Sequence, residues 1–226
     1  MRSWRMLLAL AAAVAQVGHP LETRGEDVRR WRDLNEGRIR EIAAMLSAAP
    51  RGLGPPIADR EVWATVATNR GLAGIVREAE RVMAMPMPPW DDELYLDYSR
   101  TGRRRPGEQM IAARHRRLAP LVWAEAVEAR GRFVEAIAAT LREYVREPTW
   151  TLPAHDASLR SFRGDAYNVD LAAATTAFEV GQALWMLGER LDPVVRSEVT
   201  AAIERRVFEP FRTTLRTGRG LTWVHA

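Results

Sequence analysis

Segment 148–156, which reads Pro-Thr-Trp-Thr-Leu-Pro-Ala-His-Asp, combines side chains that can bind a sugar or move a proton. Trp150 offers an aromatic face that can stack on a pyranose ring. His155 and Asp156 can hydrogen-bond hydroxyl groups or form a histidine–carboxylate pair that handles protons. The prolines indicate a loop, and loops on a rigid scaffold carry a large share of binding residues. This segment is therefore the first candidate for function.

Each candidate residue also has a purely structural interpretation. Trp150 can be a buried anchor between helices instead of a stacking platform. His155 and Asp156 can order the loop through hydrogen bonds alone. Asp170 is predicted first as the N-cap of a helix and second as a member of the same site. Glu179 lies in mid-helix among apolar neighbours, where it faces either a cleft or solvent.

The sequence excludes several kinds of chemistry. It contains no cysteine and no lysine, so it has no thiol nucleophile, disulfide, Schiff-base lysine or P-loop lysine. Its 4 histidines are scattered without the spacing of a metal site. No nucleophile-elbow, dinucleotide or P-loop motif occurs. We therefore expect no metal and no cofactor.

The charge balance does not indicate a nucleic acid partner. The formal net charge is only +4, although the isoelectric point is about 10.2. The high value arises because few groups titrate between histidine and tyrosine, so a small positive charge persists to about pH 10. The basic run 103–105, with Arg114, Arg116 and Arg117 behind it, is predicted to be a solvated turn and helix face.

The elements that must position these residues are helices. Apolar residues recur at intervals of three and four over most of the chain, and strand-like alternation is essentially missing. Glycine, proline and capping aspartates divide the pattern into segments. The predicted helices cover about 28–46, 59–82, 107–130 with a bend at Pro120, 131–147, 170–188 and 192–207. The sequence predicts an all-α fold of successive helical hairpins, with a loop at 148–169.

The N-terminus has the pattern of a signal peptide over residues 1–15. Arg2 and Arg5 precede the apolar run Met6–Val14, and Ala13-Val14-Ala15 forms a small-x-small cleavage site. A buried first helix is the alternative. The apolar run is far shorter than the ~20 residues that span a bilayer. We therefore expect an exported protein, periplasmic or secreted, that does not cross a membrane.

A series of short motifs follows in a fixed order between about residue 60 and residue 226. They are Asp92–Gly102, Gly131–Phe133, Glu147–Asp156, Val169–Leu171, Thr175–Ala177, Leu187–Leu191 and Ile203–Val207. Together they resemble the N-terminal part of the heparinase II/III-like family of polysaccharide lyases. The ordered combination is much more specific than any single motif.

This resemblance implies both a fold and a function. The fold is an incomplete (α/α) toroid of helical hairpins, formed here by residues 16–226. The function is β-elimination in an acidic, uronate-containing polysaccharide, where one group neutralises the carboxylate and a tyrosine or histidine removes the C5 proton. The substrate-binding residues implied here are Trp150, His155, Asp156, Asp170, Trp223 and His225.

The sequence departs from the family pattern at two places. An Asn/Trp-rich segment that would supply the neutralising asparagine is expected directly after Ala226, and Arg103 stands where an asparagine is expected after Gly102. We therefore expect the front part of a truncated toroid, with little or no catalysis of its own. Its exposed helical edge predicts self-association or marginal stability. The alternative is a non-catalytic helical domain that binds carbohydrate or acts as a scaffold.

Overall fold

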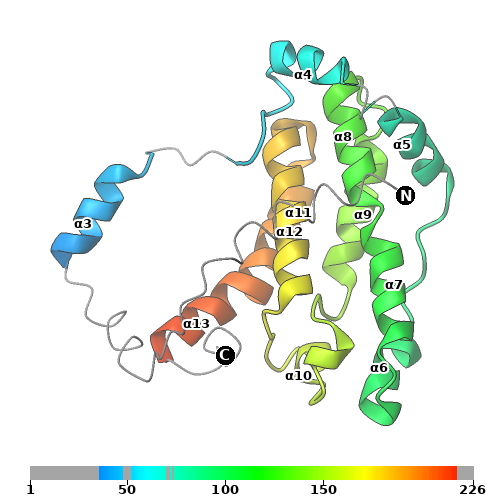
Figure 1. Ribbon diagram of the computed structural model, residues 1–226, viewed down its shortest axis with the longest axis vertical. Helices are drawn as coiled ribbons and strands as arrows, with labels where there is room; N and C mark the ends of the chain where they lie inside the picture. The colour runs from blue at the N-terminus through cyan, green and yellow to red at the C-terminus, as the bar shows by residue number, and fades with distance from the viewer. Residues whose placement is uncertain (1–35, 48–51, 70–71, 73, 218–226) are drawn as a thin grey trace, which may run out of the picture. The chain divides into compact units, whose positions relative to one another are not determined.

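The computed structural model describes residues 36–47, 52–69, 72 and 74–217. All regular secondary structure in these residues is helical (Figure 1). The all-α prediction is therefore confirmed for this part of the chain. The predicted signal peptide, Trp223 and His225 lie outside the described residues. The chain divides into two units, and α3 (Glu36–Met45), which has no buried residue, belongs to the first. The second unit spans Leu46–Thr217 and contains all that follows.

The second unit is built from helices of moderate length joined by short turns. They are α4 (Arg60–Ala67), α5 (Ile75–Ala84), α6 (Asp92–Thr101), α7 (Arg105–His115), α8 (Leu118–Glu128), α9 (Val134–Arg146), α10 (Arg160–Arg163), α11 (Leu171–Leu187), α12 (Pro193–Ile203) and α13 (Glu209–Thr217). Short 3₁₀ turns cover Pro153–His155 (η2) and Gly188–Arg190 (η3), and a π-helical turn (η4) covers Glu204–Phe208.

Three helix predictions need correction. The predicted helix 59–82 is two helices, α4 and α5, and the predicted helix 107–130 is interrupted by a turn at 116–117. Pro120 does not bend a helix, because it lies in the first turn of α8, where backbone N–H groups have no helical partner. The sequence pattern also missed α6, whose N-cap Asp91 accepts a hydrogen bond from the Glu93 amide at 2.9 Å.

The helices form two hairpins that lie side by side (Figure 1). Helix α8 leads into α9, and α11 leads into α12. Helix α8 contacts α11 while α9 contacts α12, so the two hairpins form two layers. Helix α5 packs on α8, and α6 packs on α7. These contacts agree with the predicted succession of helical hairpins, while closure into a toroid stays a prediction.

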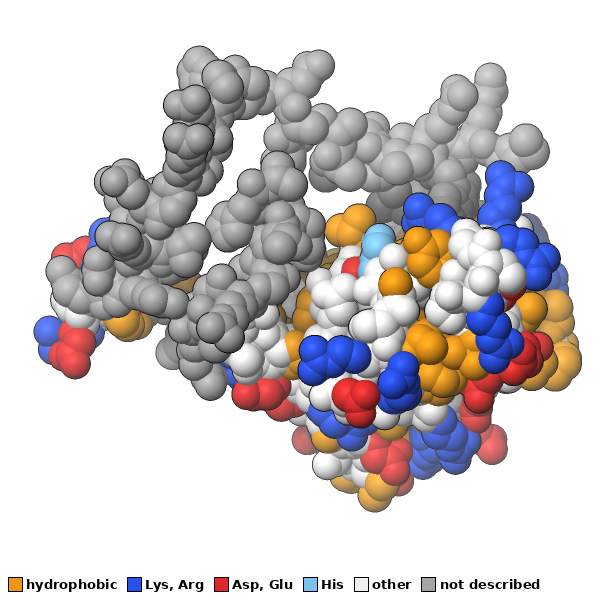
Figure 2. All heavy atoms as spheres, turned by 90° about the horizontal axis from the view of Figure 1, so that it is seen from below, with side chains coloured by type: hydrophobic (Ala, Val, Ile, Leu, Met, Phe, Trp, Pro, Cys, Tyr) orange, Lys and Arg blue, Asp and Glu red, His pale blue; other side chains and the backbone are white. Residues whose placement is uncertain are grey.

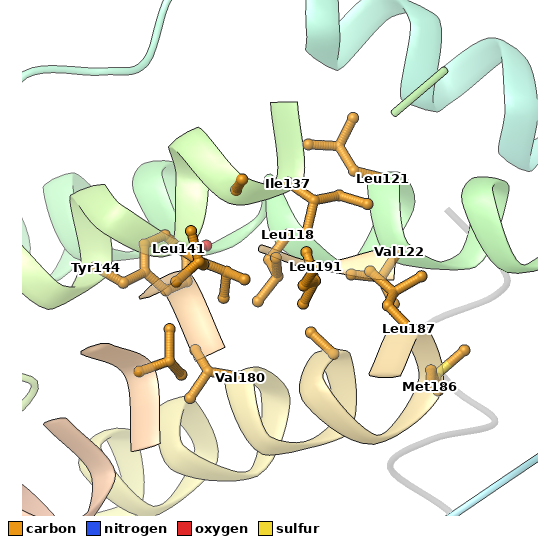
Figure 3. Packing of buried hydrophobic residues seen from close by; sticks show 14 of the residues in the cluster. Leu118, Leu121, Val122, Ile137, Leu141, Tyr144, Val180, Met186, Leu187 and Leu191 are labelled. Atoms are coloured by element: carbon orange, nitrogen blue, oxygen red, sulfur yellow. The ribbon is translucent and has the colours of Figure 1, made fainter. Parts of the chain in front are cut away.

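The main core lies between the two layers (Figure 3). It is formed by fully or almost fully buried side chains, among them Leu118, Leu121, Val122, Ile137, Leu141, Val180, Met186, Leu187 and Leu191. All of them except Leu191, which follows η3, recur at helical spacing on facing sides of α8, α9 and α11. Burial of each apolar stripe therefore requires the neighbouring helix. The core thereby fixes the ends of α9 and α11, between which the candidate loop runs.

The turn between α8 and α9 is held by a buried carboxylate. Glu125 is completely buried, and its two oxygens accept hydrogen bonds from the backbone amides of Gly131 at 2.7 Å and Phe133 at 3.1 Å. Gly131 has a φ of +80°, a conformation that glycine adopts without a steric penalty. The side chain of one helix therefore closes the hairpin that leads to the next.

Several large apolar side chains remain exposed on α11 to α13. Leu171 and Phe178 are 73% and 50% exposed and lie seven residues apart, so they share one face of α11. Val194 and Phe208 are 59% and 51% exposed. Such an apolar face favours contact with another apolar surface.

We expect this face of α11 to mediate self-association. Replacing Leu171 and Phe178 together by serine should shift the protein toward the monomer in sedimentation velocity, because the change removes exposed apolar area. Val62, which is 41% exposed on α4, provides the control, and its replacement by serine should leave the distribution unchanged. An unaltered sedimentation profile for the double variant would contradict the assignment.

None of the helices in the described ranges is long and apolar enough to cross a membrane.

Candidate functional site

The predicted loop is present between α9 and α11 and rests on α6. Its backbone is held by side chains from inside and outside the loop. The Tyr95 hydroxyl of α6 donates to the Thr151 carbonyl at 3.0 Å, and the Thr151 hydroxyl donates to the Asn168 carbonyl at 2.7 Å. The Asn168 side-chain amide donates to the His155 carbonyl at 3.0 Å. The two ends of the loop are thus tied together, which gives its side chains defined positions.

Helix α7 also supports the loop. A Cβ atom added to Gly107 would lie only 2.8 Å from the Leu94 carbonyl oxygen and 2.8 Å from Cγ of Pro153. Only glycine permits this approach without a shift of the backbone. The first turn of α7 is therefore seated directly against the 3₁₀ turn that carries His155.

Asp170 caps a helix, as predicted, and also contacts the candidate loop. It is the N-cap of α11, where its Oδ1 accepts a hydrogen bond from the Ala173 amide at 2.8 Å. Its Oδ2 accepts one from the Leu152 amide at 2.9 Å and lies 2.7 Å from Nδ1 of His155. Only 6% of Asp170 is exposed. One buried carboxylate therefore caps the helix, fixes the loop and orients the histidine.

His155 is the accessible member of this site. Its side chain is 40% exposed, whereas the Asp170 carboxylate is almost enclosed. Because an ionised carboxylate only accepts hydrogen bonds, the proton on the ring lies on Nδ1, and Nε2 is left for another partner. Within the described residues Nε2 makes no hydrogen bond. The pair can accept a hydrogen bond, or a proton, from a ligand at the surface.

Asp156 is a loop-ordering residue. It is 3% exposed, and its oxygens accept hydrogen bonds from the amides of Ser161 at 3.0 Å and Phe162 at 2.8 Å, and from the Tyr95 hydroxyl at 3.2 Å. Of the alternatives for these two residues, Asp156 takes the loop-ordering one, and the carboxylate that pairs with His155 is Asp170 instead of Asp156. Burial, helped by the charge of Asp156, raises the pKa of Tyr95 well above its ordinary value, so the phenol stays protonated.

Trp150 occupies the core instead of the surface. It is 1% exposed, and its indole Nε1 donates to the Tyr144 carbonyl at 2.9 Å. The guanidinium carbon of Arg206 lies 4.9 Å from the ring centroid, within the range of a cation–π contact. Of the two roles predicted for Trp150, the buried anchor agrees with this position, because no ring face is open to a sugar.

A second polar cluster lies next to the loop and was not predicted. Glu147, whose side chain has no exposed surface, lies 2.6 Å from Nε of Arg114 and 2.8 Å from Nε2 of His115. The other ring nitrogen of His115 lies 3.1 Å from the Thr176 hydroxyl, and its ring stacks on Tyr144 at 4.4 Å. This cluster joins α7 and α11 to the end of α9, directly before the candidate loop.

The predicted solvated arginine face is correct for Arg116 and wrong for its neighbours. Arg116 is exposed, but Arg114 and Arg117 are only 2% and 8% exposed. Arg117 donates hydrogen bonds to the carbonyls of Met85 at 2.9 Å and Pro86 at 3.2 Å, and burial lowers its pKa. These contacts hold the proline-rich connection between α5 and α6 against the turn between α7 and α8.

Arg206 is a further buried cation that sequence analysis did not identify. It donates to the carbonyls of Tyr144 at 3.1 Å and Val145 at 2.9 Å and also to the carbonyl of Glu147. It therefore satisfies the last carbonyls of α9, which have no helical donor. The one sequence signal that points to Arg206 is the motif Ile203–Val207, of which it is a member. Most of this motif lies in the π-helical turn η4, and π-helical turns are frequent at functional sites.

The surface around the loop carries separate arginines instead of one continuous basic patch. The end of the molecule that bears α6 and α10 shows arginine side chains at several places, with acidic and apolar side chains between them (Figure 2). Arg103 and Arg104 pair with Asp97 and Glu108 at 2.9 and 3.0 Å. Arg105 and Arg160 are exposed, and neither has an ion pair within the described ranges.

No protein-family model matches this chain, and no curated protein matches it. Among the described residues, no group of three histidine, aspartate or glutamate side chains is placed to hold a metal ion. What the site can do therefore follows from its own geometry. It offers one oriented histidine, an enclosed carboxylate behind it, and unpaired arginines on the elements that touch the loop.

Proposed function

We propose that this chain is the helical front part of an exported heparinase II/III-like lyase, and that its 148–169 loop contacts an acidic, uronate-containing polysaccharide. The observation that carries the proposal is the His155–Asp170 pair, in which a buried carboxylate at 2.7 Å orients an exposed imidazole. An oriented ring nitrogen is suited to a sugar hydroxyl, because little conformational freedom is lost on binding.

The convergence of the resembling motifs supports this proposal. Tyr95 from the first motif contacts Asp156 from the third at 3.2 Å, and Asp170 from the fourth contacts His155. Arg206 from the last motif covers Trp150. Segments separated by more than fifty residues therefore supply the parts of one loop and its support. The paired hairpins are those expected at the beginning of an incomplete (α/α) toroid.

The arginines supply the charge that an acidic ligand requires. Arg105 begins α7, whose Gly107 abuts Pro153, and Arg160 begins α10 within the loop region itself. A guanidinium binds a carboxylate with two parallel hydrogen bonds, so these side chains are suited to uronate groups. None of the residues predicted to bind substrate is the asparagine that neutralises the uronate carboxylate in the lyase pattern. We therefore propose that this chain binds the polysaccharide with little or no turnover.

Binding should depend on His155. We expect His155→Ala to weaken binding of polygalacturonate or chondroitin about tenfold, since one oriented hydrogen bond to the ligand is lost. Isothermal titration calorimetry measures the affinity, and thermal unfolding should change little because the side chain is 40% exposed. Arg130→Gln, an exposed change in the turn after α8, is the control for general loss of positive charge.

Binding through the loop and the lack of turnover can be tested independently. Equal affinity of the wild type and the His155→Ala variant would show that His155 does not contact the polysaccharide, which contradicts the proposed binding site. Formation of a 4,5-unsaturated uronate by the 226-residue chain would contradict the expected lack of turnover. Binding that persists without any unsaturated product in a longer version with further helices would favour the non-catalytic carbohydrate-binding domain.

A further inference from the structure

The 148–169 loop packs on a small apolar cluster that is separate from the main core. The cluster is formed by Tyr95 from α6 and by Met110 and Ile111 from α7, all of them buried. Phe162 of α10 packs against these residues and is itself half-buried. Phe162 therefore lies at the boundary between this cluster and solvent.

The ring of Phe162 is held in one orientation. It stacks on the ring of Tyr95, with centroids 5.1 Å apart and planes inclined by 18°. Tyr95 is completely buried and its hydroxyl is bonded to the Thr151 carbonyl, so its own ring is fixed. Because Tyr95 covers one side of the Phe162 ring, whatever part of that ring reaches solvent lies on the other side and at its edge.

The backbone that carries Phe162 is fixed as well. The two oxygens of Asp156 accept hydrogen bonds from the amides of Ser161 at 3.0 Å and Phe162 at 2.8 Å. Leu159, directly before α10, has a φ of +57°, which is costly for a residue with a Cβ atom, so the surrounding contacts must stabilise it. The Asp156 bonds thus join the Phe162 backbone to the residue that follows His155.

Positively charged side chains flank Phe162 in α10. Arg160 and Arg163 are both exposed. Arg163 donates to the Ser158 carbonyl at 3.0 Å, whereas Arg160 has no ion pair in the part of the chain that the structure describes. Apolar side chains lie between arginines on this end of the molecule (Figure 2). A uronate ring has matching features, namely an apolar face of C–H groups and a carboxylate at its edge.

Phe162 fits a stacking role better than the other two aromatic rings of the loop. Trp150, the ring predicted for this role, is only 1% exposed. Tyr167 has the guanidinium carbon of Arg206 at 5.8 Å from its ring centroid, so a cation of the protein already lies against it. The cover on Phe162 is an uncharged ring on one side.

We propose that Phe162 is the aromatic platform of the polysaccharide site, with the apolar face of a uronate ring stacked on its outer side and the uronate carboxylate bound by Arg160. The choice of ligand rests on the proposed function. The platform adds to the His155–Asp170 pair a contact that reads the C–H face of the sugar, whereas His155 contacts a hydroxyl.

The test uses a galacturonate oligosaccharide and the transfer of nuclear magnetic saturation from the aromatic protons of the protein to the sugar. We expect the hydrogens on C3, C4 and C5 of galacturonate to receive most of the saturation, because they share one face of the ring. Phe162→Leu, which keeps an apolar side chain for the cluster but has no aromatic face, should abolish this pattern and weaken binding in calorimetry about fivefold. Phe162→Tyr should retain both.

A matched control and the wild type make the outcomes decisive. Phe211→Leu, the same change at a ring on α13 that is 42% exposed, should alter neither the saturation pattern nor the affinity. Urea denaturation shows whether Phe162→Leu remains folded. The wild type needs no variant: bound galacturonate with saturation spread evenly over all its hydrogens would overturn the platform.

Failure of the platform is distinct from failure of the proposed function. If His155→Ala weakens binding while Phe162→Leu leaves affinity and saturation unchanged, the platform is wrong and the binding loop stands. If the wild type binds no acidic polysaccharide, the proposed function itself is wrong, and the platform falls with it.

Discussion

Replacing Trp150 by alanine should lower the free energy of unfolding by about 4 kcal/mol, in the range found for large buried aromatic residues. The side chain is 1% exposed, so its removal leaves a cavity between α9 and the loop. Two specific contacts disappear with it: the hydrogen bond to the Tyr144 carbonyl at 2.9 Å and the contact with Arg206 at 4.9 Å. The buried guanidinium of Arg206 then loses its cation–π contact with the indole ring.

Trp150→Phe separates the packing of the ring from its hydrogen bond. Phenylalanine fills most of the space but cannot donate, so the Tyr144 carbonyl loses one partner and we expect a loss of about 1–2 kcal/mol. Urea denaturation measures both variants, and Phe211→Ala, at a side chain on α13 that is 42% exposed, is the control for an aromatic residue outside the core. A small effect of Trp150→Ala together with lost sugar binding would favour the stacking role instead.

The helices around the site were predicted well wherever local signals define their ends. The predicted helix 170–188 is α11 at Leu171–Leu187, and the predicted helix 131–147 is α9 at Val134–Arg146. Asp170 and Asp192 are the expected N-caps, with hydrogen bonds to the amides of Ala173 and Val194. Capping depends on residues within one turn, so sequence alone contains the necessary information.

The helices that were missed or joined lack such a clear apolar stripe. Helix α6 is ten residues long, and Tyr95 is its only buried residue, so its periodicity is weak. Its ends were nevertheless visible in the sequence, with Asp91 at the start and Gly102, at a φ of +76°, at the end. The turn at 116–117 lies between two apolar segments in register, which explains why α7 and α8 were predicted as one helix.

The predicted 148–169 loop is present between α9 and α11, but the pairing of its side chains was not predictable. Neighbours in sequence, such as His155 and Asp156, point in different directions at the end of a 3₁₀ turn. The partner of His155 is instead Asp170, whose Oδ2 the fold of the loop places 2.7 Å from Nδ1 of the histidine. Likewise, only tertiary packing decides that Arg114 is buried and Arg116 exposed. Side-chain pairing over long sequence separations requires the structure.

Glu147 is the second position at which we expect a large effect. Glu147→Gln should destabilise the protein by about 3 kcal/mol, because it leaves buried Arg114 with only the longer and partly exposed ion pair to Glu143, at 3.4 Å. Arg114 lies 2.6 Å from this carboxylate, and the side chains are 2% and 0% exposed, so solvent cannot replace the lost interaction. His115, at 2.8 Å, loses its acceptor in the same substitution.

A matched exposed pair distinguishes burial from simple loss of a charge. Glu78 and Arg81 on α5 form an ion pair of similar length, 2.5 Å, but their side chains are 44% and 58% exposed. Exposed pairs contribute little because water and salt screen them, so Glu78→Gln should leave the urea midpoint nearly unchanged. Joint replacement of Arg114 by methionine and Glu147 by glutamine should recover part of the loss, since no unpaired charge then remains in the core. If the double variant is no more stable than Glu147→Gln alone, the effect comes from packing or from His115 instead of from the stranded guanidinium.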